Sequence, residues 1–311
     1  MSTLAAPSTA HTAYNYALVD VFAERALEGN QLAIFTDARG LTDLEMQALA
    51  HETNLSETTF LLPRSPQIER EHGVRVRIFT SEEELPFAGH PTLGTASWLY
   101  LNHPELRGSE TLRLDLNIGS IPVRFTPPQT GEAGVFATMR QNDPIFGAPQ
   151  ESEALAHVLG LPLDDIDPDL PIQTVTTGNP FCLVPLRSLE ALKRLTLPNT
   201  AEIAQYLKQN NAKFFYFLAP TFGSHEVSWR ARMMFYGRED PATGSAAGPA
   251  IAWLLRHGRA QSGETILLEQ GIEMKRPSRL TLSAQINAGE ITEVFVGGRT
   301  IPVATGRFFL P

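Results

Sequence analysis

The sequence repeats a part of itself at half its length, and this repeat constrains the fold more than any other feature. Residues 85–91 and the apolar stretch after them return in related form from 240–246 onward. The identical pairs are Pro86 and Pro241, Gly89 and Gly244, Trp98 and Trp253, and Leu99 and Leu254. The start of a helix presents unpaired backbone N–H groups that attract anions. Two halves that each open a helix with such a loop therefore predict one active site between them.

The length and the repeat together predict two domains. The spacing of the repeat within 311 residues favours two units of about 150 residues each. A Pro/Gly-rich segment at 127–132 marks the expected boundary between them. We expect a flexible tail over 1–13, an N-terminal domain over 14–130 and a C-terminal domain over 131–301. A last strand at about 302–311 is expected to return to the N-terminal domain.

The hydrophobic pattern predicts an α+β fold. The two repeated helices, at 93–101 and 246–255, are apolar almost all round, so each is expected inside its own sheet. Most other apolar segments have the alternation and the turn residues of strands. A parallel βαβ sheet is the alternative, but it needs amphipathic helices that alternate regularly with strands. The pattern favours two similar halves, each a mostly β structure around one buried helix.

Local signals predict how the two buried helices begin and end. In the first, His90 is expected at the N-cap and Pro91 at the first helical position. In the second, Ser245 is a possible N-cap, Pro249 is expected within about the first turn, and Gly258 is expected just after the helix.

Composition excludes several classes of function. The net charge of −9, with scattered basic residues, disfavours a surface for nucleic acid or anionic lipid. No run approaches the ~18 apolar residues of a membrane span, and the first residues lack the pattern of a signal peptide. The one cysteine, Cys182, cannot form an intrachain disulfide. We therefore expect a protein of the reducing cytoplasm that binds neither nucleic acid nor membrane.

Cofactor and metal motifs are missing from the sequence. No G-x-G-x-x-G opens a helix after a strand, and the segment 240–245 lacks the lysine of a phosphate-binding loop. Zinc-protease spacing and the G-x-S-x-G elbow of serine hydrolases are also absent. We expect neither a cofactor nor a metal, and acid–base chemistry is what remains.

Four side chains are candidates for that chemistry, and each has a structural alternative. Glu57 lies where a helix ends and an apolar strand begins, which favours a partly desolvated carboxyl with a raised pKa, although a glutamate there is commonly a solvated surface residue. His90 could be an N-cap or a core histidine. Asp240 could serve a turn or a helix dipole, and Ser245 could be an N-cap alone.

Several segments taken together resemble the signatures of the PhzF family. They run in order through the chain and are Gly29-Asn30, 54–58, 84–91, 239–249, 268–271 and 276–278. The family is similar in fold to diaminopimelate epimerase, so the resemblance implies two pseudo-symmetric domains, each a curled sheet around a central helix, with the site in the cleft. One departure is Gln31, where many relatives have proline.

The resemblance also implies roles for particular residues. PhzF isomerises trans-2,3-dihydro-3-hydroxyanthranilate without a cofactor, and Glu57 matches its proton-shuttling carboxylate. His90, Asp240 and Ser245 match polar residues of its substrate pocket. Gly89 and Gly244 would let backbone amides approach the substrate carboxylate. The resemblance further implies a homodimer that acts on a small anionic molecule.

The cysteine count separates this chain from the related two-thiol racemases. Diaminopimelate epimerase and proline racemase use one thiol from each half, whereas His90 and Ser245 stand at these places here, and Cys182 lies in an apolar run typical of a core strand. Three functions stay open. They are a cofactor-independent isomerase, an epimerase that pairs Glu57 with a base such as His90 or Asp240, and a binding protein that has lost turnover.

Overall fold

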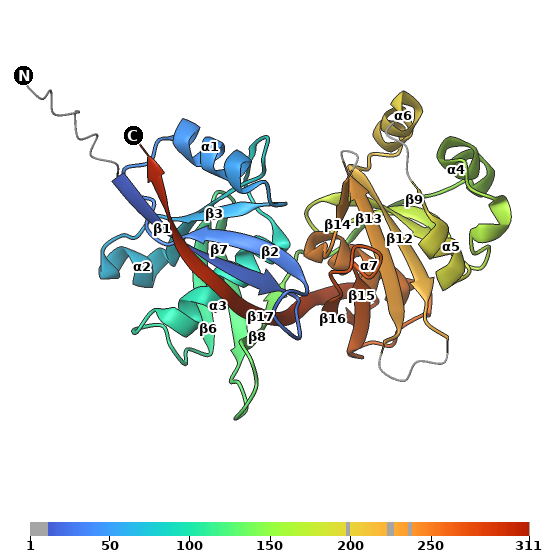
Figure 1. Ribbon diagram of the computed structural model, residues 1–311. Coiled ribbons are helices and arrows are strands. Elements are labelled where there is room, and N and C mark those ends of the chain that lie inside the picture. The colour runs from blue at the N-terminus through green and yellow to red at the C-terminus, as the bar shows by residue number, and fades with distance from the viewer. Residues whose placement is uncertain (1–11, 197–199, 223–226, 236–237, 311) are drawn as a thin grey trace, which may run out of the picture.

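The computed structural model describes residues 12–196, 200–222, 227–235 and 238–310 (Figure 1). Its helices are α1 (Asp43–Thr53), α2 (Pro66–His72), α3 (Gly89–Asn102), α4 (Ser152–Leu159), the 3₁₀ turn η1 (Leu163–Asp165), α5 (Leu189–Arg194), α6 (Ala201–Gln209) and α7 (Gly244–Arg256). Its strands are β1 (Thr12–Val21), β2 (Asn30–Phe35), β3 (Thr58–Leu61), β4 (Val74–Phe79), β5 (Glu84–Leu85), β6 (Thr111–Leu116), β7 (Gly119–Thr126), β8 (Val135–Arg140), β9 (Ile145–Gln150), β10 (Ile172–Thr176), β11 (Pro180–Pro185), β12 (Phe214–Pro220), β13 (Trp229–Phe235), β14 (Arg238–Asp240), β15 (Ile266–Gln270), β16 (Ser278–Asn287) and β17 (Glu290–Leu310).

The N-terminal lobe is a closed barrel around α3. Its strands pair in the circular order β17, β1, β2, β3, β4, β6, β7, β8 and back to β17. Alternation sets the inner face, because Val74, Val76 and Ile78 of β4 are buried while the arginines between them are not. Helix α3 is buried over most of its length, as its apolar sequence predicts.

The C-terminal lobe is a second curled sheet, around α7. Its strands pair in the order β17, β16, β15, β13, β12, β11, β10, β9. The open side between β9 and β17 is spanned just after β8, where the Gln141 N–H donates to the Val294 carbonyl at 2.8 Å. Figure 1 shows α4, α5 and α6 on the outer side of this lobe. The predicted fold class is thus confirmed, with one buried helix inside each sheet.

Strand β17 joins the two lobes. Its first part pairs with β16 of the C-terminal lobe, and its last part, Thr300 to Leu310, pairs with β1 (Figure 1). Thr12 and Ala13, which the sequence analysis assigns to a flexible tail, are paired with Leu310 and Phe309. The prediction is wrong for these two residues, because β17 supplies backbone partners that lie almost 300 residues away in the sequence. The rest of that expected tail, 1–11, lies outside the described residues.

The predicted helix starts are corrected by the structure. Helix α3 begins at Gly89 with Ala88 as its N-cap, so His90 and Pro91 are the second and third helical residues. Helix α7 begins at Gly244 with Thr243 as its N-cap, so Ser245 does not cap it and Pro249 lies inside the helix, beyond the first turn. Neither N-cap side chain bonds to the helix, and the Thr243 hydroxyl donates to Asp240 at 2.6 Å instead. Gly258 follows the helix with a left-handed φ of 69°, as expected.

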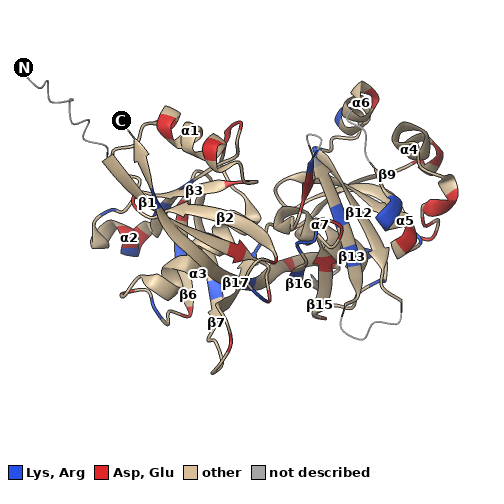
Figure 2. Cartoon of the chain, in the orientation of Figure 1, with Lys and Arg blue, Asp and Glu red and all other residues tan. Residues whose placement is uncertain are grey.

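Charged residues of both signs are interspersed over both lobes (Figure 2). Of the helices within the described ranges, none is long and apolar enough to cross a membrane.

Candidate active site

A cavity of about 650 Å³ lies between the two lobes. Its volume is in the range of ordinary small-molecule sites. All six residues that the sequence analysis selects line it: Glu57, Gly89, His90, Asp240, Gly244 and Ser245. Residues some 150–190 positions apart in the sequence therefore meet in one space.

The starts of α3 and α7 meet at this cavity. A Cβ atom on Gly89 would lie 3.1 Å from the backbone nitrogen of Ser245, so the approach leaves no room for a side chain. Because neither N-cap side chain bonds to its helix, the amides of Gly89, His90, Gly244 and Ser245 have no hydrogen-bond partner among the described residues. Four N–H groups and two positive helix ends are thus available to an anion.

Glu57 lies in the short connection between α1 and β3. Asn54 ends α1 in the left-handed conformation, and β3 begins at Thr58, as the sequence predicts. The Glu57 side chain is 17% exposed, and its Oε2 lies 3.5 Å from His90 Nδ1. Burial raises its pKa to about 8, with a further contribution from the negative charge of Asp240, while Lys213 acts in the opposite direction. Near neutral pH this carboxyl can both give and accept a proton.

His90 is almost completely buried beside Glu57. Burial lowers its pKa to about 3, against a hydrogen bond with the Gln31 backbone that favours the charged ring. The imidazole is therefore neutral near pH 7 and offers one N–H donor and one acceptor nitrogen. Its Nε2 atom has no hydrogen-bond partner among the described residues. A neutral histidine beside a protonated glutamate adds no net charge to the site.

Asp240 ends β14 and approaches the cavity from the C-terminal lobe. Its carboxylate accepts hydrogen bonds from Thr243 Oγ1 at 2.6 Å, Asn30 Nδ2 at 2.8 Å and Ser56 Oγ at 3.2 Å. Burial raises its pKa to about 6, and these three bonds hold the pKa below that of Glu57. Of the two acids, Asp240 ionises first, and its charge favours the protonated form of Glu57.

Asn30 connects the catalytic candidates of the two lobes. Its amide nitrogen donates to Asp240 and to the Ala242 carbonyl at 2.9 Å, and it lies 3.4 Å from His90 Nδ1. In the sequence, Asn30 stands only as part of the Gly29-Asn30 motif, which predicts no role for its side chain. Its position directly after a turn glycine is a signal for a turn, and nothing in the local sequence shows that its amide reaches the other lobe.

Gln270 is a second supporting residue that sequence reasoning missed. Its Nε2 donates to the Asp240 carbonyl at 2.7 Å and to Thr243 Oγ1 at 2.9 Å, while its Oε1 accepts from the Thr243 N–H and from Tyr216. Three of these four contacts fix the segment that leads from Asp240 into α7. Gln270 therefore determines where Asp240 and the helix start lie relative to each other.

Basic residues also line the cavity, although neither repeated loop contains one. Lys213 directly precedes β12, and Arg140 ends β8. The resemblance assigns the substrate carboxylate to backbone amides near Gly89 and Gly244, and neither of these basic residues lies in the motifs that carry it. Cys182 lies in β11, fully buried, and burial raises the pKa of its thiol, in agreement with the predicted core role.

Comparisons with known proteins agree with this geometry. The model of the family described as phenazine biosynthesis-like protein, PhzC-PhzF, matches residues 19–306. The trans-2,3-dihydro-3-hydroxyanthranilate isomerase of Pseudomonas fluorescens is 35% identical over 96% of this chain and 100% of its own length. A solved structure described as a predicted epimerase from Pseudomonas aeruginosa is 36% identical, with a TM-score of 0.79 over 95% of this chain and 99% of that chain. A PhzF-family structure from Bacillus anthracis is 27% identical, with a TM-score of 0.84 over 96% of this chain and 100% of that chain.

Proposed function

The chain belongs to the PhzC-PhzF family and is an isomerase, and from this premise we propose that it shifts a proton and a double bond in a small anionic cyclic compound, by general acid–base catalysis and without a cofactor. The best candidate substrate is trans-2,3-dihydro-3-hydroxyanthranilate, which the Pseudomonas fluorescens relative is named for. One observation carries the proposal. A buried carboxyl, Glu57, whose pKa is raised to about 8, lines the same cavity as two helix starts with unpaired amides.

Glu57 is the proposed proton shuttle. As a carboxylate it removes a proton from one ring carbon, and as the resulting acid it returns a proton to another carbon on the same face. A pKa close to the working pH suits both steps, since neither form is then strongly disfavoured. His90 and Asp240 are proposed to bind polar groups of the substrate beside Glu57. The negative charge of Asp240, which ionises first, raises the pKa of Glu57, so the ionised fraction of Glu57 that starts the reaction is a stronger base.

The amides at the two helix starts are proposed to bind the substrate carboxylate, with Ser245 beside it. Each helix end adds about 0.3–1 kcal/mol to the hydrogen bonds themselves. The Glu57 carboxyl is expected to face the ring carbons and not this anionic group, because a second negative charge in contact would raise its pKa further at the expense of binding. Gly89 and Gly244 serve here through their lack of a side chain.

The substitution Glu57→Gln tests the proposal. Turnover of trans-2,3-dihydro-3-hydroxyanthranilate in deuterated water is followed by NMR, and we expect the wild type to shift the double bond. Glu57→Gln should lower the rate by at least ~10² with substrate binding retained, because an amide cannot exchange the proton. Exposed Glu52→Gln in α1 is the control and should keep wild-type turnover. Wild-type turnover by the Glu57→Gln variant would refute the shuttle, and deuterium with inverted configuration but an unshifted double bond would identify an epimerase instead.

We also propose that the chain acts as a homodimer in the reducing cytoplasm. The resemblance to the family supports the dimer, and the single buried Cys182 is compatible with a reducing compartment. Light scattering coupled to size-exclusion chromatography tests the oligomer directly, and a mass of one chain would contradict it.

A further inference from the structure

Charged residues of both signs line the cavity. Lys213, directly before β12 of the C-terminal lobe, and Arg140, at the end of β8 of the N-terminal lobe, are its basic residues. Glu82 and Glu83 line the cavity from the connection between β4 and β5 of the N-terminal lobe.

Lys213 lines the cavity as a cation without an ion-pair partner among the described residues. Its backbone N–H is fixed by a bond to the Pro180 carbonyl at 2.9 Å, and its ammonium lies 5.5 Å from the centre of the Phe214 ring. No carboxylate forms an ion pair with it among the residues that the structure describes. Its positive charge is nevertheless felt by Glu57, whose pKa it lowers. Lys213 and Glu57 therefore interact electrostatically within the same cavity.

The residues around Lys213 form a place for a ligand group. Phe181 and Phe214 give an apolar surface, with ring centres 6.2 Å apart, and both line the cavity. Arg140 adds a second cation, held by Asp143 at 3.4 Å in a pair of which both members are half exposed. Such an exposed pair contributes little free energy, so a ligand can replace Asp143 at low cost.

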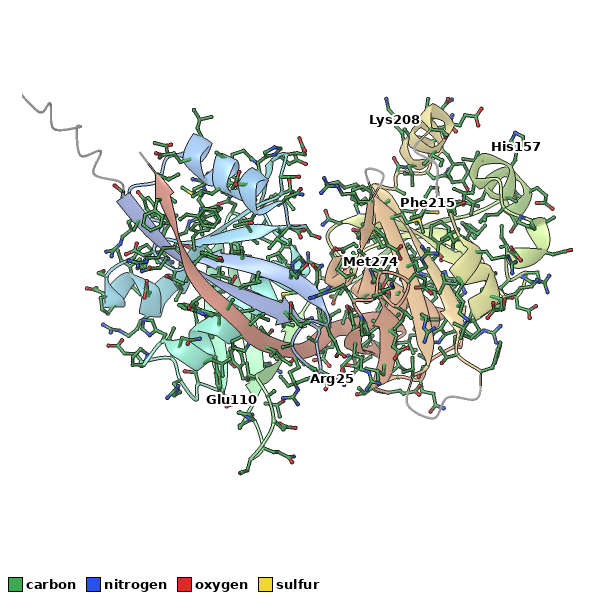
Figure 3. The ribbon with its side chains drawn as sticks, viewed as in Figure 1. Arg25, Glu110, His157, Lys208, Phe215 and Met274 are labelled. Carbon is green, nitrogen blue, oxygen red and sulfur yellow. The ribbon has the colours of Figure 1, made fainter. Side chains whose placement is uncertain are left out.

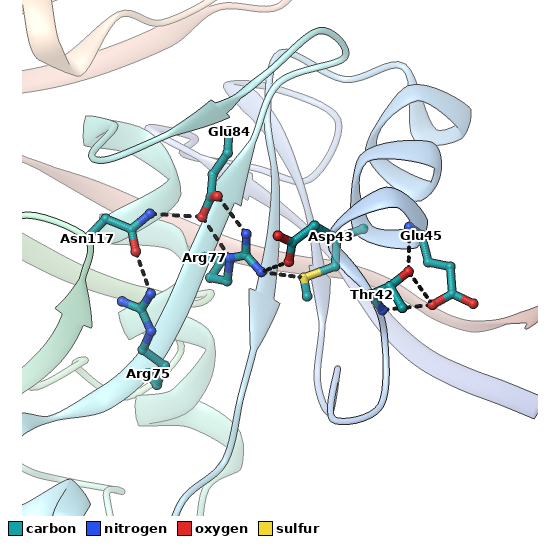
Figure 4. Close-up of polar contacts among 8 residues, drawn as sticks. Thr42, Asp43, Glu45, Arg75, Arg77, Glu84 and Asn117 are labelled. Carbon is teal, nitrogen blue, oxygen red and sulfur yellow. Dashed lines mark hydrogen bonds and ion pairs between the residues drawn. The ribbon is translucent and has the colours of Figure 1, made fainter.

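The acidic residues of the connection between β4 and β5 disfavour a negative group beside them. Glu84 is neutralised, because Arg77 donates to both of its carboxylate oxygens at 2.7 and 2.6 Å (Figure 4). Glu82 and Glu83 are exposed and have no ion pair among the described residues. An anionic group in the cavity is thus repelled by Glu82 and Glu83 and attracted to Lys213.

We propose that Lys213, with Arg140, forms a second anion subsite, and that the enzyme prefers substrates that carry two acidic groups. One is held at the helix starts near Gly89 and Gly244, and the other at Lys213. The inference rests on the proposed function for the class of reaction, and it narrows the class of substrate. A ring with a single carboxylate, such as trans-2,3-dihydro-3-hydroxyanthranilate, would leave Lys213 unused and should bind more weakly than a related diacid.

Binding of simple aromatic acids tests the subsite without knowledge of the natural substrate. Benzoate has one carboxylate, whereas phthalate, isophthalate and terephthalate have two at different separations. Calorimetric titration of the wild type at low salt should show that at least one dicarboxylate binds about tenfold tighter than benzoate, as expected for a charge-assisted contact. Lys213→Met should remove this preference, Lys213→Arg should retain most of it, and Arg140→Gln should reduce it.

Lys208→Met is the matched control. Lys208 lies on α6 of the same lobe, exposed and outside the cavity lining (Figure 3), so this variant changes the net charge equally. It should keep the preference for the dicarboxylate. Equal binding of benzoate and every dicarboxylate by the wild type, or an undiminished preference in Lys213→Met, would overturn the proposal. The shuttle is tested separately, by the turnover of Glu57→Gln, so a failed shuttle and a failed subsite give different results.

Discussion

At the scale of single residues, the site is organised by the different pKa values of three neighbouring groups. Burial favours the neutral form of each group. It raises the pKa to about 8 for Glu57 and about 6 for Asp240, and lowers it to about 3 for His90. Only Asp240 receives enough hydrogen bonds to be ionised at neutral pH. The free enzyme thus holds one negative charge, a protonated acid and a neutral ring at this place.

The raised pKa of Glu57 predicts a pH dependence of stability. In the unfolded chain this carboxyl loses its proton near pH 4.5, whereas in the folded protein it keeps the proton up to about pH 8. Between these values the folded state binds more protons, so the free energy of unfolding falls as the pH rises, by up to about 1.4 kcal/mol per pH unit. The contribution is complete below about pH 4.5 and lost by about pH 8.

Urea unfolding between pH 7 and 8 measures this contribution, because the folded-state pKa values of Asp240 and His90 lie below the window. Glu57→Gln should have a flatter profile than the wild type and should gain relative stability as the pH rises. Exposed Glu52→Gln should keep the wild-type slope. If the profiles of the wild type and Glu57→Gln were parallel, Glu57 would not be protonated in the folded protein.

At the scale of elements, the buried helices are fitted closely to their sheets. A Cβ atom on Gly94 of α3 would lie 2.6 Å from Val21 Cγ2 of β1 and 2.8 Å from Leu32 Cδ2 of β2. Carbon atoms cannot approach so closely. Because glycine has no side chain at this position, α3 can pack directly against the two strands. The same strands lead to the Gly29-Asn30 turn, and the fit therefore also sets the distance from His90 to Asn30.

Gly94→Ala should destabilise the protein through this contact. We expect the free energy of unfolding to fall by about 1–3 kcal/mol, as for overpacked cores, although alanine favours the helix itself. Ser97→Ala is the control within the same helix, since the buried Ser97 hydroxyl has no hydrogen-bond partner among the described residues and its removal should be neutral or stabilising. Denaturant unfolding of both variants measures the difference. If Gly94→Ala lowered the free energy of unfolding no more than Ser97→Ala, α3 would tolerate a larger residue at this position.

At the scale of the whole molecule, contacts across the two lobes fix the site. Besides β17, Arg276 of the C-terminal lobe provides an extensive link. Its guanidinium donates to the buried Asp20 carboxylate at 2.7 Å, to the Gly29 carbonyl at 3.0 Å and to the Glu28 carbonyl at 2.5 Å. These three acceptors belong to β1 and the turn before Asn30. Arg276 therefore holds the N-terminal segment from which Asn30 reaches Asp240.

Arg276→Met should be strongly destabilising. The substitution leaves the Asp20 carboxylate buried with its charge uncompensated, and breaking such a pair costs about 3–5 kcal/mol. Arg25→Met is the comparison, because Arg25 belongs to the same turn but forms an exposed pair with Glu28, which should contribute at most about 1 kcal/mol. Thermal unfolding of both variants distinguishes them. A loss at Arg276 no larger than at Arg25 would mean that the lobes do not depend on this contact.

Much of the architecture could be predicted because it depends on the order of apolar and polar residues within short segments. Alternation identifies β4, the all-apolar helices identify α3 and α7, and the repeat indicates two similar halves. The predicted starts of the helices are wrong for a local reason as well. Ser245 has the side chain of an N-cap, but the helix begins at Gly244, two residues before the predicted start, and its N-cap Thr243 donates its hydroxyl to Asp240 and not to the helix.

By itself the sequence determined which residues have the chemistry for the site, since Glu57, His90 and Asp240 are recognisable from their motifs. Only the tertiary structure decided what these groups do to one another. A pKa depends on burial and on charges within a few ångströms, and Glu57, Asp240 and Lys213 become neighbours only when both lobes have formed. The same holds for Asn30, which bonds to a carboxylate 210 residues away, and for Lys213, which lines the same cavity as Glu57 although the two residues belong to different lobes. Such contacts arise from the packing of distant segments, and no local pattern encodes them.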